Sequence, residues 1–447
     1  MQMDYTEFIR SKARVIEDCG FAMPDGYDYL YPFQRSLVEF ACKRGRSALY
    51  CDCGLGKTPM QLSWADAVVN HAGPVLILTP LAVSEQTKRE ADKFGIEAYH
   101  SREGDISDRI TITNYERLHK YKPGYFSGIV LDESSILKNY AGKYRQAITD
   151  FMQGIPYRLL CTATPAPNDH MELGTSSEAL GIMKRKEMLS VFFTHDSGDT
   201  NKWILSGHAK DPFWEFMAQW SRAVRKPSDC GDYDDTEFSL PDMRMVQHTL
   251  PSKPVGDRLF AVEAVTLAEQ RAERRATMTD RCDKVAEIAN ANDEPFIAWC
   301  ALNDESAMLK DKISGAVEIC GSDSDAEKER KMLGFSDGSI RAIVTKPSIA
   351  GFGMNWQHCN RMSFFPSHSH EQFYQASRRC WRFGQKREVE CHIVTTEAEV
   401  SVTKNMQRKE RLADEMFDGI VSGMKRYQKE SKKTTYQPTK KMEMPKW

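Results

Sequence analysis

The segment that most constrains the fold is the glycine-rich stretch CDCGLGKTP, at residues 51–59. A short apolar run, SALYC, leads into it. Apolar side chains then recur at the spacing of one helical face, at Met60, Trp64, Ala67 and Val68. The pattern predicts a buried strand, a tight loop and a helix that begins directly after the loop.

The residue types within this loop predict that it binds phosphate groups. Gly54 and Gly56 permit unusual backbone angles and a close approach of the main chain to a ligand. Lys57 supplies a positive charge, and Thr58 offers a hydroxyl group to Mg²⁺. Cys51 stands where the pattern G-x-x-x-x-G-K-[ST] has its first glycine, but that position only begins the bend.

Further apolar runs alternate with helical patterns along the whole chain. In the first half they are PVLILT, ITITN, GIVLD and YRLLC, and in the second half FIAWC, RAIVT, RMSFF and VECHIVTT. Strands that alternate with helices are typical of doubly wound parallel sheets. We therefore predict an α/β protein with two such domains in tandem and a ligand cleft between them.

The domain limits follow from where these patterns weaken. We predict a first domain over 1–250, with an irregular insertion at 185–240 that includes a hairpin-like stretch. A linker rich in proline and glycine is expected near 250–256, followed by a second domain over 251–425. Residues 426–447 are rich in lysine and are expected to form a basic flexible tail.

Two further motifs carry candidate catalytic groups. Asp132 and Glu133 directly follow the apolar run GIVL, where a strand end can place carboxylates beside Mg²⁺ and the attacking water. If the segment 371–385 is helical throughout, Gln375, Arg379 and Arg382 share one face. Arginines so placed can stabilise the charge that develops on a transferred phosphate.

The composition excludes some classes of protein. The net charge is −2, which is not the strongly basic balance of a protein coated by nucleic acid, so a binding surface would have to be a local groove. No apolar run is long enough to cross a bilayer, and the N-terminal residues lack a secretory pattern. We expect a cytoplasmic protein that keeps its cysteines reduced and has no membrane partner.

Taken in order, the motifs resemble those of the superfamily-two helicase-like ATPases, related to the DEAD/DEAH-box proteins, and within them the Swi/Snf-type DNA translocases. The resemblance runs from about residue 31 to about residue 424. It rests on PFQRSLVEF, CDCGLGKT, TPLAVSEQTKREADKF, ITNYERL, LDESS, TATP, WSRAVRK, KPSIAGFGMNWQ and QASRRCWRFGQK. The compact chain is more similar to bacterial or phage members of this group than to chromatin remodellers.

The resemblance implies two RecA-like domains that bind ATP and Mg²⁺ between them, with a role for each matched residue. Catalysis would involve Lys57, Asp132, Glu133, Gln375, Arg379 and Arg382. ATP would contact Gln34, which would read the adenine, and Gly54, Leu55, Gly56, Lys57, Thr58 and Gly353. Thr58 and Asp132 would hold Mg²⁺, and Thr162 and Thr164 would couple the ATP site to a nucleic-acid surface that includes Thr79, Pro80, Thr113, Asn114 and Lys346.

Departures from the family pattern and shared motifs leave alternatives open. Ser134 and Ser135 end the acidic motif where relatives have Ala-His or Ser-His, which puts the usual coupling role of that position in question. The segment KPSIAGFGMNWQ keeps only part of its family pattern. The first hypothesis is an ATP-driven translocase on double-stranded DNA. The alternatives are a strand-separating or branch-remodelling helicase, an RNA helicase, or a non-enzymatic scaffold with a decayed site.

Overall fold

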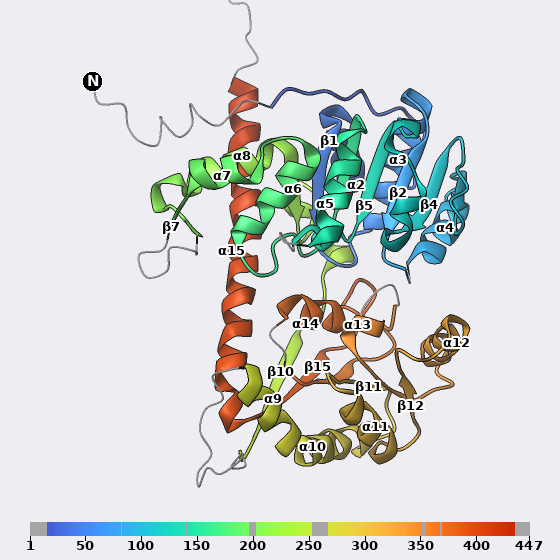
Figure 1. Ribbon diagram of the computed structural model, residues 1–447, viewed down its shortest axis with the longest axis vertical. Coiled ribbons are helices and arrows are strands. Elements are labelled where there is room, and N and C mark those ends of the chain that lie inside the picture. The colour runs from blue at the N-terminus through green and yellow to red at the C-terminus, as the bar shows by residue number, and fades with distance from the viewer. Residues whose placement is uncertain are drawn as a thin grey trace, which may run out of the picture.

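Two parallel β-sheets, one in each half of the chain, organise the fold (Figure 1). The computed structural model describes residues 16–81, 83–138, 142–195, 203–252, 267–350, 355–366 and 369–433. Each sheet carries helices on both faces, so the prediction of two doubly wound α/β domains is confirmed. We call them the first and second lobes.

The first lobe is built on a parallel sheet in the order β3-β4-β2-β5-β6-β1-β9. Its strands are β1 (Arg46–Cys51), β2 (Val75–Thr79), β3 (Ala98–His100), β4 (Ile110–Asn114), β5 (Gly128–Asp132), β6 (Tyr157–Cys161) and β9 (Ser221–Val224). The helices are α2 (Pro32–Arg44), α3 (Lys57–His71), α4 (Ser84–Lys93), α5 (Lys143–Gln153), α6 (Leu173–Leu180), α7 (Arg185–Phe192) and α8 (Lys210–Trp220). A short antiparallel hairpin joins β7 (Phe193–His195) to β8 (Trp203–Leu205).

Alternate residues of the central strands bury opposite faces of this sheet. In β2, Leu76 and Leu78 belong to the core formed with α5, α6, α7 and α8, whereas Val75 and Ile77 face α2 and α3. Strands β2 and β5 are buried at every position and mostly apolar because both faces of the sheet are covered, which is why these runs could be recognised in the sequence. The carboxyl ends of β1 and β5 then bring residues 51–58 and 132–133 to one edge.

The second lobe has its own parallel sheet, in the order β10-β15-β14-β11-β13-β12. The strands are β10 (Met243–Leu250), β11 (Phe296–Trp299), β12 (Ala316–Ile319), β13 (Ala342–Thr345), β14 (Arg361–Phe364) and β15 (Val389–Thr396). The helices are α9 (Leu267–Ala276), α10 (Met278–Asn290), α11 (Asn303–Lys312), α12 (Asp325–Ser336), α13 (Pro347–Ala350) and α14 (His370–Ser377).

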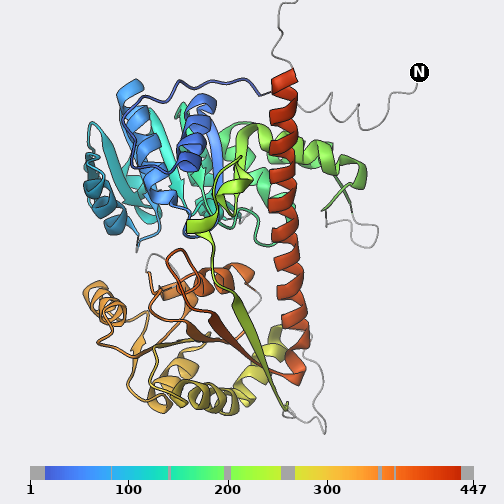
Figure 2. The same ribbon diagram turned by 180° about the vertical axis from the view of Figure 1, so that it is seen from behind.

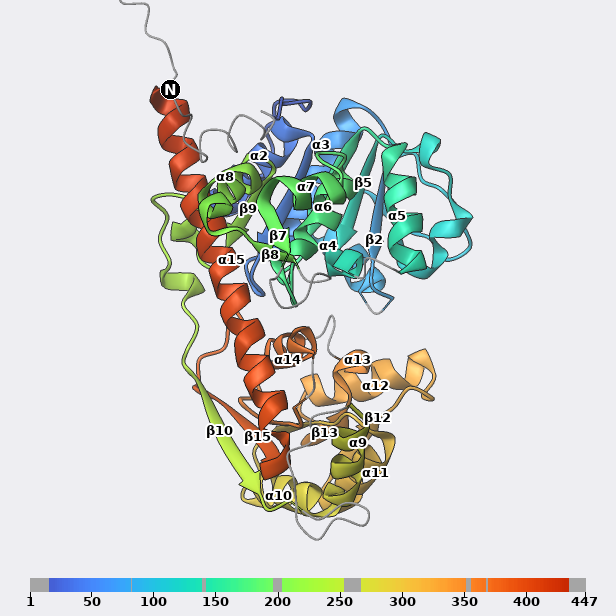
Figure 3. The ribbon, with the colours of Figure 1, turned by 60° about the vertical axis from the view of Figure 1, so that its left-hand side comes forward.

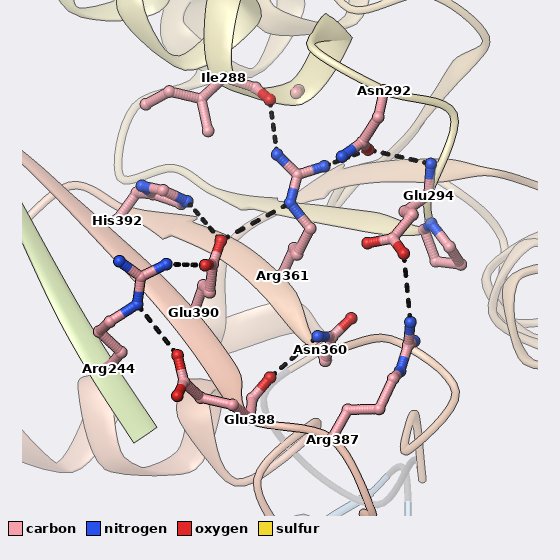
Figure 4. Close-up of polar contacts among 12 residues, drawn as sticks. Arg244, Ile288, Asn292, Glu294, Asn360, Arg361, Arg387, Glu388, Glu390 and His392 are labelled. Carbon is pink, nitrogen blue, oxygen red and sulfur yellow. Dashed lines mark hydrogen bonds and ion pairs between the residues drawn. The ribbon is translucent and has the colours of Figure 1, made fainter. Parts of the chain in front are cut away.

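Strand β10 does not lie in the lobe that the sequence predicts for it. The predicted boundary at residue 250 places residues 243–250 at the end of the first domain. In the structure β10 pairs with β15 along its full length in the second sheet. Side chains reinforce this pairing (Figure 4): Arg244 forms ion pairs with Glu388 and Glu390, and the Glu390 carboxylate also lies 3.9 Å from Arg361 of β14. The chain therefore enters the second lobe before residue 250.

The last helix, α15 (Val400–Lys433), connects the two lobes along one side of the molecule (Figures 2 and 3). It begins beside the second sheet, and its later turns pack on α8 and β9 of the first lobe. Met416, Phe417, Ile420 and Met424 thereby join the core of the first lobe. The helix includes residues 426–433, which we had placed in a flexible tail. The rest of that predicted tail lies outside the described residues.

None of the described helices combines the length and the apolar content that a bilayer span requires.

Candidate nucleotide site at the seam of the lobes

The glycine-rich loop joins the end of β1 to the start of α3, as the sequence predicts. Gly54 and Gly56 have φ angles of +92° and +74°, which side-chain-bearing residues rarely adopt. Neighbours also leave no room for a side chain. A Cβ atom on Gly54 would lie 2.8 Å from the main-chain nitrogen of Phe383, and one on Gly56 would lie 2.3 Å from the Gln34 amide nitrogen. The loop is thus closely enclosed on both sides.

Lys57 lies in the first turn of α3 and turns back onto the loop. Its Nζ donates to the carbonyl oxygens of Cys51, at 3.0 Å, and Asp52, at 3.4 Å. Burial lowers the pKa of Lys57, but Cys53 and Glu133 outweigh that effect, so its pKa is raised. The amine therefore stays protonated and available to a phosphate. Thr58 follows in the same turn, next to the loop.

Asp132 and Glu133 end the neighbouring strand β5 and have different environments. The Asp132 carboxylate is buried and accepts a hydrogen bond of 2.7 Å from Gln61. Burial, with Glu133 beside it, raises the pKa of Asp132 to about 6. A carboxylate and the hydroxyl of Thr58 are oxygen donors of the kind that Mg²⁺ prefers, so this donor set fits the predicted ion.

Glu133 has an unusual backbone conformation and contacts Thr162, which directly follows strand β6. Its φ angle is +52°, the only positive value among the described residues other than glycine. Such angles cost free energy and are concentrated at functional sites. Its carboxylate accepts a hydrogen bond of 3.2 Å from Thr162, whose hydroxyl also accepts one of 3.1 Å from the Thr164 amide. The two threonines thus link Glu133 to the segment after β6.

The arginine-rich segment of the second lobe is not the continuous helix that we expected. Helix α14 ends at Ser377, and residues 378–384 form turns. The Trp381 indole donates to the Pro241 carbonyl at 2.6 Å, which draws the chain away from the helix axis. Gln375, Arg379 and Arg382 therefore do not share a helical face, although the Arg379 guanidinium still donates to the Gln375 carbonyl at 3.0 Å.

Arg382 nevertheless lies near the phosphate loop, because the next residue, Phe383, has its main-chain nitrogen 2.8 Å from where a Cβ atom on Gly54 would lie. Burial lowers the pKa of Arg382 to about 10, Arg379 acts in the same direction, and Cys53 of the loop and Glu90 of α4 oppose them. Cys53 also influences the pKa of Lys57. Charged groups of the two lobes are therefore close to the same loop residue.

Two second-lobe residues that the sequence analysis did not nominate contact the loop directly. The Arg378 guanidinium donates to the Asp52 carboxylate at 2.5 Å, and the Tyr374 hydroxyl donates to the same carboxylate. No local sequence pattern predicts the contact between Asp52 and Arg378, because the two residues are 326 positions apart. The clue would have been an acid inside the phosphate loop and an extra arginine before Arg379.

Gln34, the predicted adenine reader, is buried and supports the loop. Its amide nitrogen donates to the Leu55 carbonyl at 2.9 Å, and its amide oxygen accepts from the Tyr31 main chain at 3.0 Å. In this arrangement Gln34 holds the bend of the phosphate loop from behind. Gly353, the one predicted ATP contact from the second lobe, lies outside the described residues.

The predicted nucleic-acid contacts lie at strand ends, but most of their side chains have internal partners. Thr79 shares a hydrogen bond of 2.7 Å with Ser84, Thr113 donates to the Ser101 carbonyl at 3.0 Å, and Asn114 accepts from the Arg117 amide at 3.2 Å. These side chains shape the ends of β2 and β4. Pro80 follows β2 and is partly exposed, and Lys346 follows β13 and donates to Asn303 at 2.6 Å. Their contact with nucleic acid stays a prediction.

A cavity of about 530 Å³ lies beside the phosphate loop, between the lobes and α15. Its walls come from the loop (Asp52 to Leu55), the segment after β6 (Thr164), the α14 segment (Tyr374, Arg378) and α15 (Phe417).

Comparisons with known proteins give partial matches. No family model matches the chain. Chromodomain-helicase-DNA-binding protein 1-like from Danio rerio is 28% identical over an alignment of 174 residues that covers 33% of this chain and 17% of that protein. SWI/SNF-related matrix-associated actin-dependent regulator of chromatin subfamily A-like protein 1 from Xenopus tropicalis is 29% identical over an alignment of 163 residues that covers 34% of this chain and 17% of that protein.

A solved structure described as the Sulfolobus solfataricus SWI2/SNF2 ATPase core in complex with dsDNA aligns with 94% of this chain and 98% of its own, at 17% identity and a TM-score of 0.42. The curated relatives are much longer than the chain, whose matches span less than a fifth of their length. Over about a third of its length, the chain is therefore similar in sequence to proteins of the Swi/Snf and chromodomain-helicase groups.

Proposed function

We propose that the protein hydrolyses ATP with Mg²⁺ in the seam between its lobes and uses the energy to move along double-stranded DNA. The observation that supports this most directly is the arrangement around the phosphate loop. Lys57, Asp132 and Glu133 meet at the strand ends of the first lobe, and Arg378 and Arg382 of the second lobe approach the same loop.

Each group has a proposed role. Lys57 contacts the outer phosphates, Thr58 and Asp132 hold Mg²⁺, and Glu133 orients and activates the attacking water. The bound Mg²⁺ would neutralise charge on the phosphates. Arg379 and Arg382 stabilise the charge that develops during transfer, a role for which one arginine is typically worth about 10³–10⁵ in turnover.

Thr162 and Thr164 are proposed to couple this chemistry to the strand ends at Pro80 and Asn114, where the backbone of the nucleic acid would lie. The hydrogen bond from Thr162 to Glu133 is the physical link. Contacts to phosphates rather than bases would make binding insensitive to sequence and strongly dependent on salt.

The test compares ATP hydrolysis by the whole chain with duplex DNA, single-stranded DNA, RNA and no nucleic acid. We expect duplex DNA to stimulate hydrolysis most, and Lys57→Ala to reduce it to background. Lys186→Ala, which removes an exposed lysine of α7, is the matched control and should leave the rate unchanged.

A strand-displacement assay on forked DNA and RNA separates translocation from unwinding, because a translocase hydrolyses ATP on duplex DNA without releasing a strand. Hydrolysis that persists in Lys57→Ala contradicts the proposal. Stimulation by RNA alone would replace it with an RNA helicase.

A further inference from the structure

A single carboxylate in the phosphate loop holds the second lobe. Asp52 Oδ2 accepts a hydrogen bond of 2.5 Å from Arg378, and Oδ1 accepts from the Tyr374 hydroxyl and, at 2.7 Å, from the Cys53 amide. The side chains of Asp52 and Arg378 are only 12% and 7% exposed. Both oxygens of Asp52 are therefore engaged at the seam, where Asp52 and Arg378 also line the cavity.

The arginine is as fixed as the carboxylate. Its guanidinium lies over the ring of Trp381, 4.1 Å from the ring centre, and 5.1 Å from the ring centre of Tyr374. A charge enclosed in this way depends on its partner, because removal of either member leaves the other buried without compensation. The pair should therefore behave as a unit.

Asp52 also contacts the catalytic lysine, but through its main chain. Its carbonyl oxygen accepts from Lys57 Nζ at 3.4 Å, next to the Cys51 carbonyl at 3.0 Å. A nucleotide phosphate that binds Lys57 competes with these two carbonyls for the three N–H donors of the amine. One residue is thus bonded to the phosphate-sensing lysine by its main chain and to the second lobe by its side chain.

We propose that Asp52 is a positioning residue, which couples occupancy of the phosphate loop to the orientation of the second lobe through Arg378 and Tyr374. The inference rests on the proposed ATP hydrolysis and deepens it. Arg379 directly follows Arg378, and Arg382 comes three residues later, so the pair sets where these two guanidinium groups lie relative to the loop. Loss of the pair should impair turnover more than ATP binding.

The test is a double-mutant cycle with Asp52→Asn, Arg378→Gln and the combination of both, read as kcat and KM for ATP. We expect each single change to lower kcat by about tenfold or more and to change KM by less than about threefold. The kcat of the double variant should lie within about threefold of the kcat of the less active single variant, because each single change already removes the ion pair. Arg387→Gln breaks the exposed pair with Glu294 and is the control, with unchanged kinetics.

A second measurement does not depend on hydrolysis. Amide hydrogen exchange should become faster in residues 50–56 and 373–383 together in each single variant, and should remain slow there in Arg387→Gln. Tyr374→Phe, which removes only the hydroxyl, should give the same changes to a smaller extent, and it decides the question if Asp52→Asn does not fold.

Two results overturn the inference: additive losses of kcat in the double variant, or unchanged exchange and kcat when the pair or the hydroxyl is removed. Its failure is distinguishable from that of the proposed function. If Lys57→Ala retains hydrolysis, the ATPase assignment fails, whereas the exchange experiment still shows whether Asp52 holds the second lobe.

Discussion

The docking of α15 on the first lobe can be tested through two glycines that form a notch for Trp214. A Cβ atom on Gly419 would lie 2.4 Å from the Trp214 indole, and one on Gly423 would lie 2.5 Å from the Trp214 carbonyl oxygen. Ordinary contacts begin at 3.4 Å, so each added methyl group would overlap its neighbour by about 1 Å. Trp214 is only 2% exposed and has little room to move.

Replacing both Gly419 and Gly423 with alanine has two opposite effects on the free energy of unfolding. Higher helix propensity raises it, and overpacking against Trp214 lowers it. Helix propensity alone stabilises the double variant by about 2 kcal/mol, or about 1 kcal/mol for each glycine replaced. Overpacking costs about 1–3 kcal/mol at each site. We expect the upper part of that range, because one obstacle is main chain and the other a buried ring. The net result is a loss of about 2 kcal/mol or more.

Thermal unfolding measures the sign of this balance directly. A loss of about 2 kcal/mol should lower Tm by about 4–8 °C for a cooperative unit of the size of one lobe. Gly207→Ala is the control, because no atom lies within 4 Å of its added Cβ, and it should leave Tm nearly unchanged. If Tm of the double variant rises instead, helix propensity has prevailed and α15 does not pack on Trp214 as described.

Three further predictions concern the seam and the second lobe. Gly54→Ala should lower kcat and destabilise the protein by about 1–3 kcal/mol, because its Cβ meets Phe383 and its φ is positive; steady-state kinetics with a melting curve check this. Arg281→Met should cost about 3–5 kcal/mol in a denaturant titration, since it leaves the fully buried Glu305 carboxylate unpaired, and an unchanged midpoint would contradict the role of the pair. Burial lowers the pKa of His392 to about 4, so the unfolded chain binds more protons than the folded one between about pH 4 and 6.5, and stability should fall as pH falls through that window. Melting curves at pH 7.5 and 5 should show a smaller decrease for His392→Gln than for the unchanged chain.

The sequence predicts the first lobe well because its signals are local. The central strands β2 and β5 are buried along their whole length, and the glycine-rich loop lies between the end of β1 at Cys51 and the start of α3 at Lys57. The same reasoning placed Asp132 and Glu133 at a strand end on the same edge of the sheet. In each case the neighbours along the chain determine where the residue lies.

The helix expected over 371–385 shows where local reasoning fails. Its apolar positions, Phe373, Ala376 and Cys380, fit a helical period, yet α14 ends at Ser377. The main chain there is bonded to distant residues, since the Arg379 carbonyl accepts from the Trp356 amide and the Trp381 indole donates to Pro241. The apolar residues keep a helical spacing beyond Ser377, but only the eight residues of α14 form a helix. Hydrogen bonds to distant parts of the chain determine the backbone after that point.

The contacts that join the lobes are the least accessible to sequence reasoning, and they bear most directly on function. Asp52 and Arg378 are 326 positions apart, and His170 of the first lobe bonds to the Leu412 carbonyl of α15 across 242 positions. If ATP binding changes the angle between the lobes, the change has to be transmitted through contacts of this kind. The motifs point to the groups that we propose for the chemistry, whereas these long-range pairs fix how the two lobes are held relative to each other.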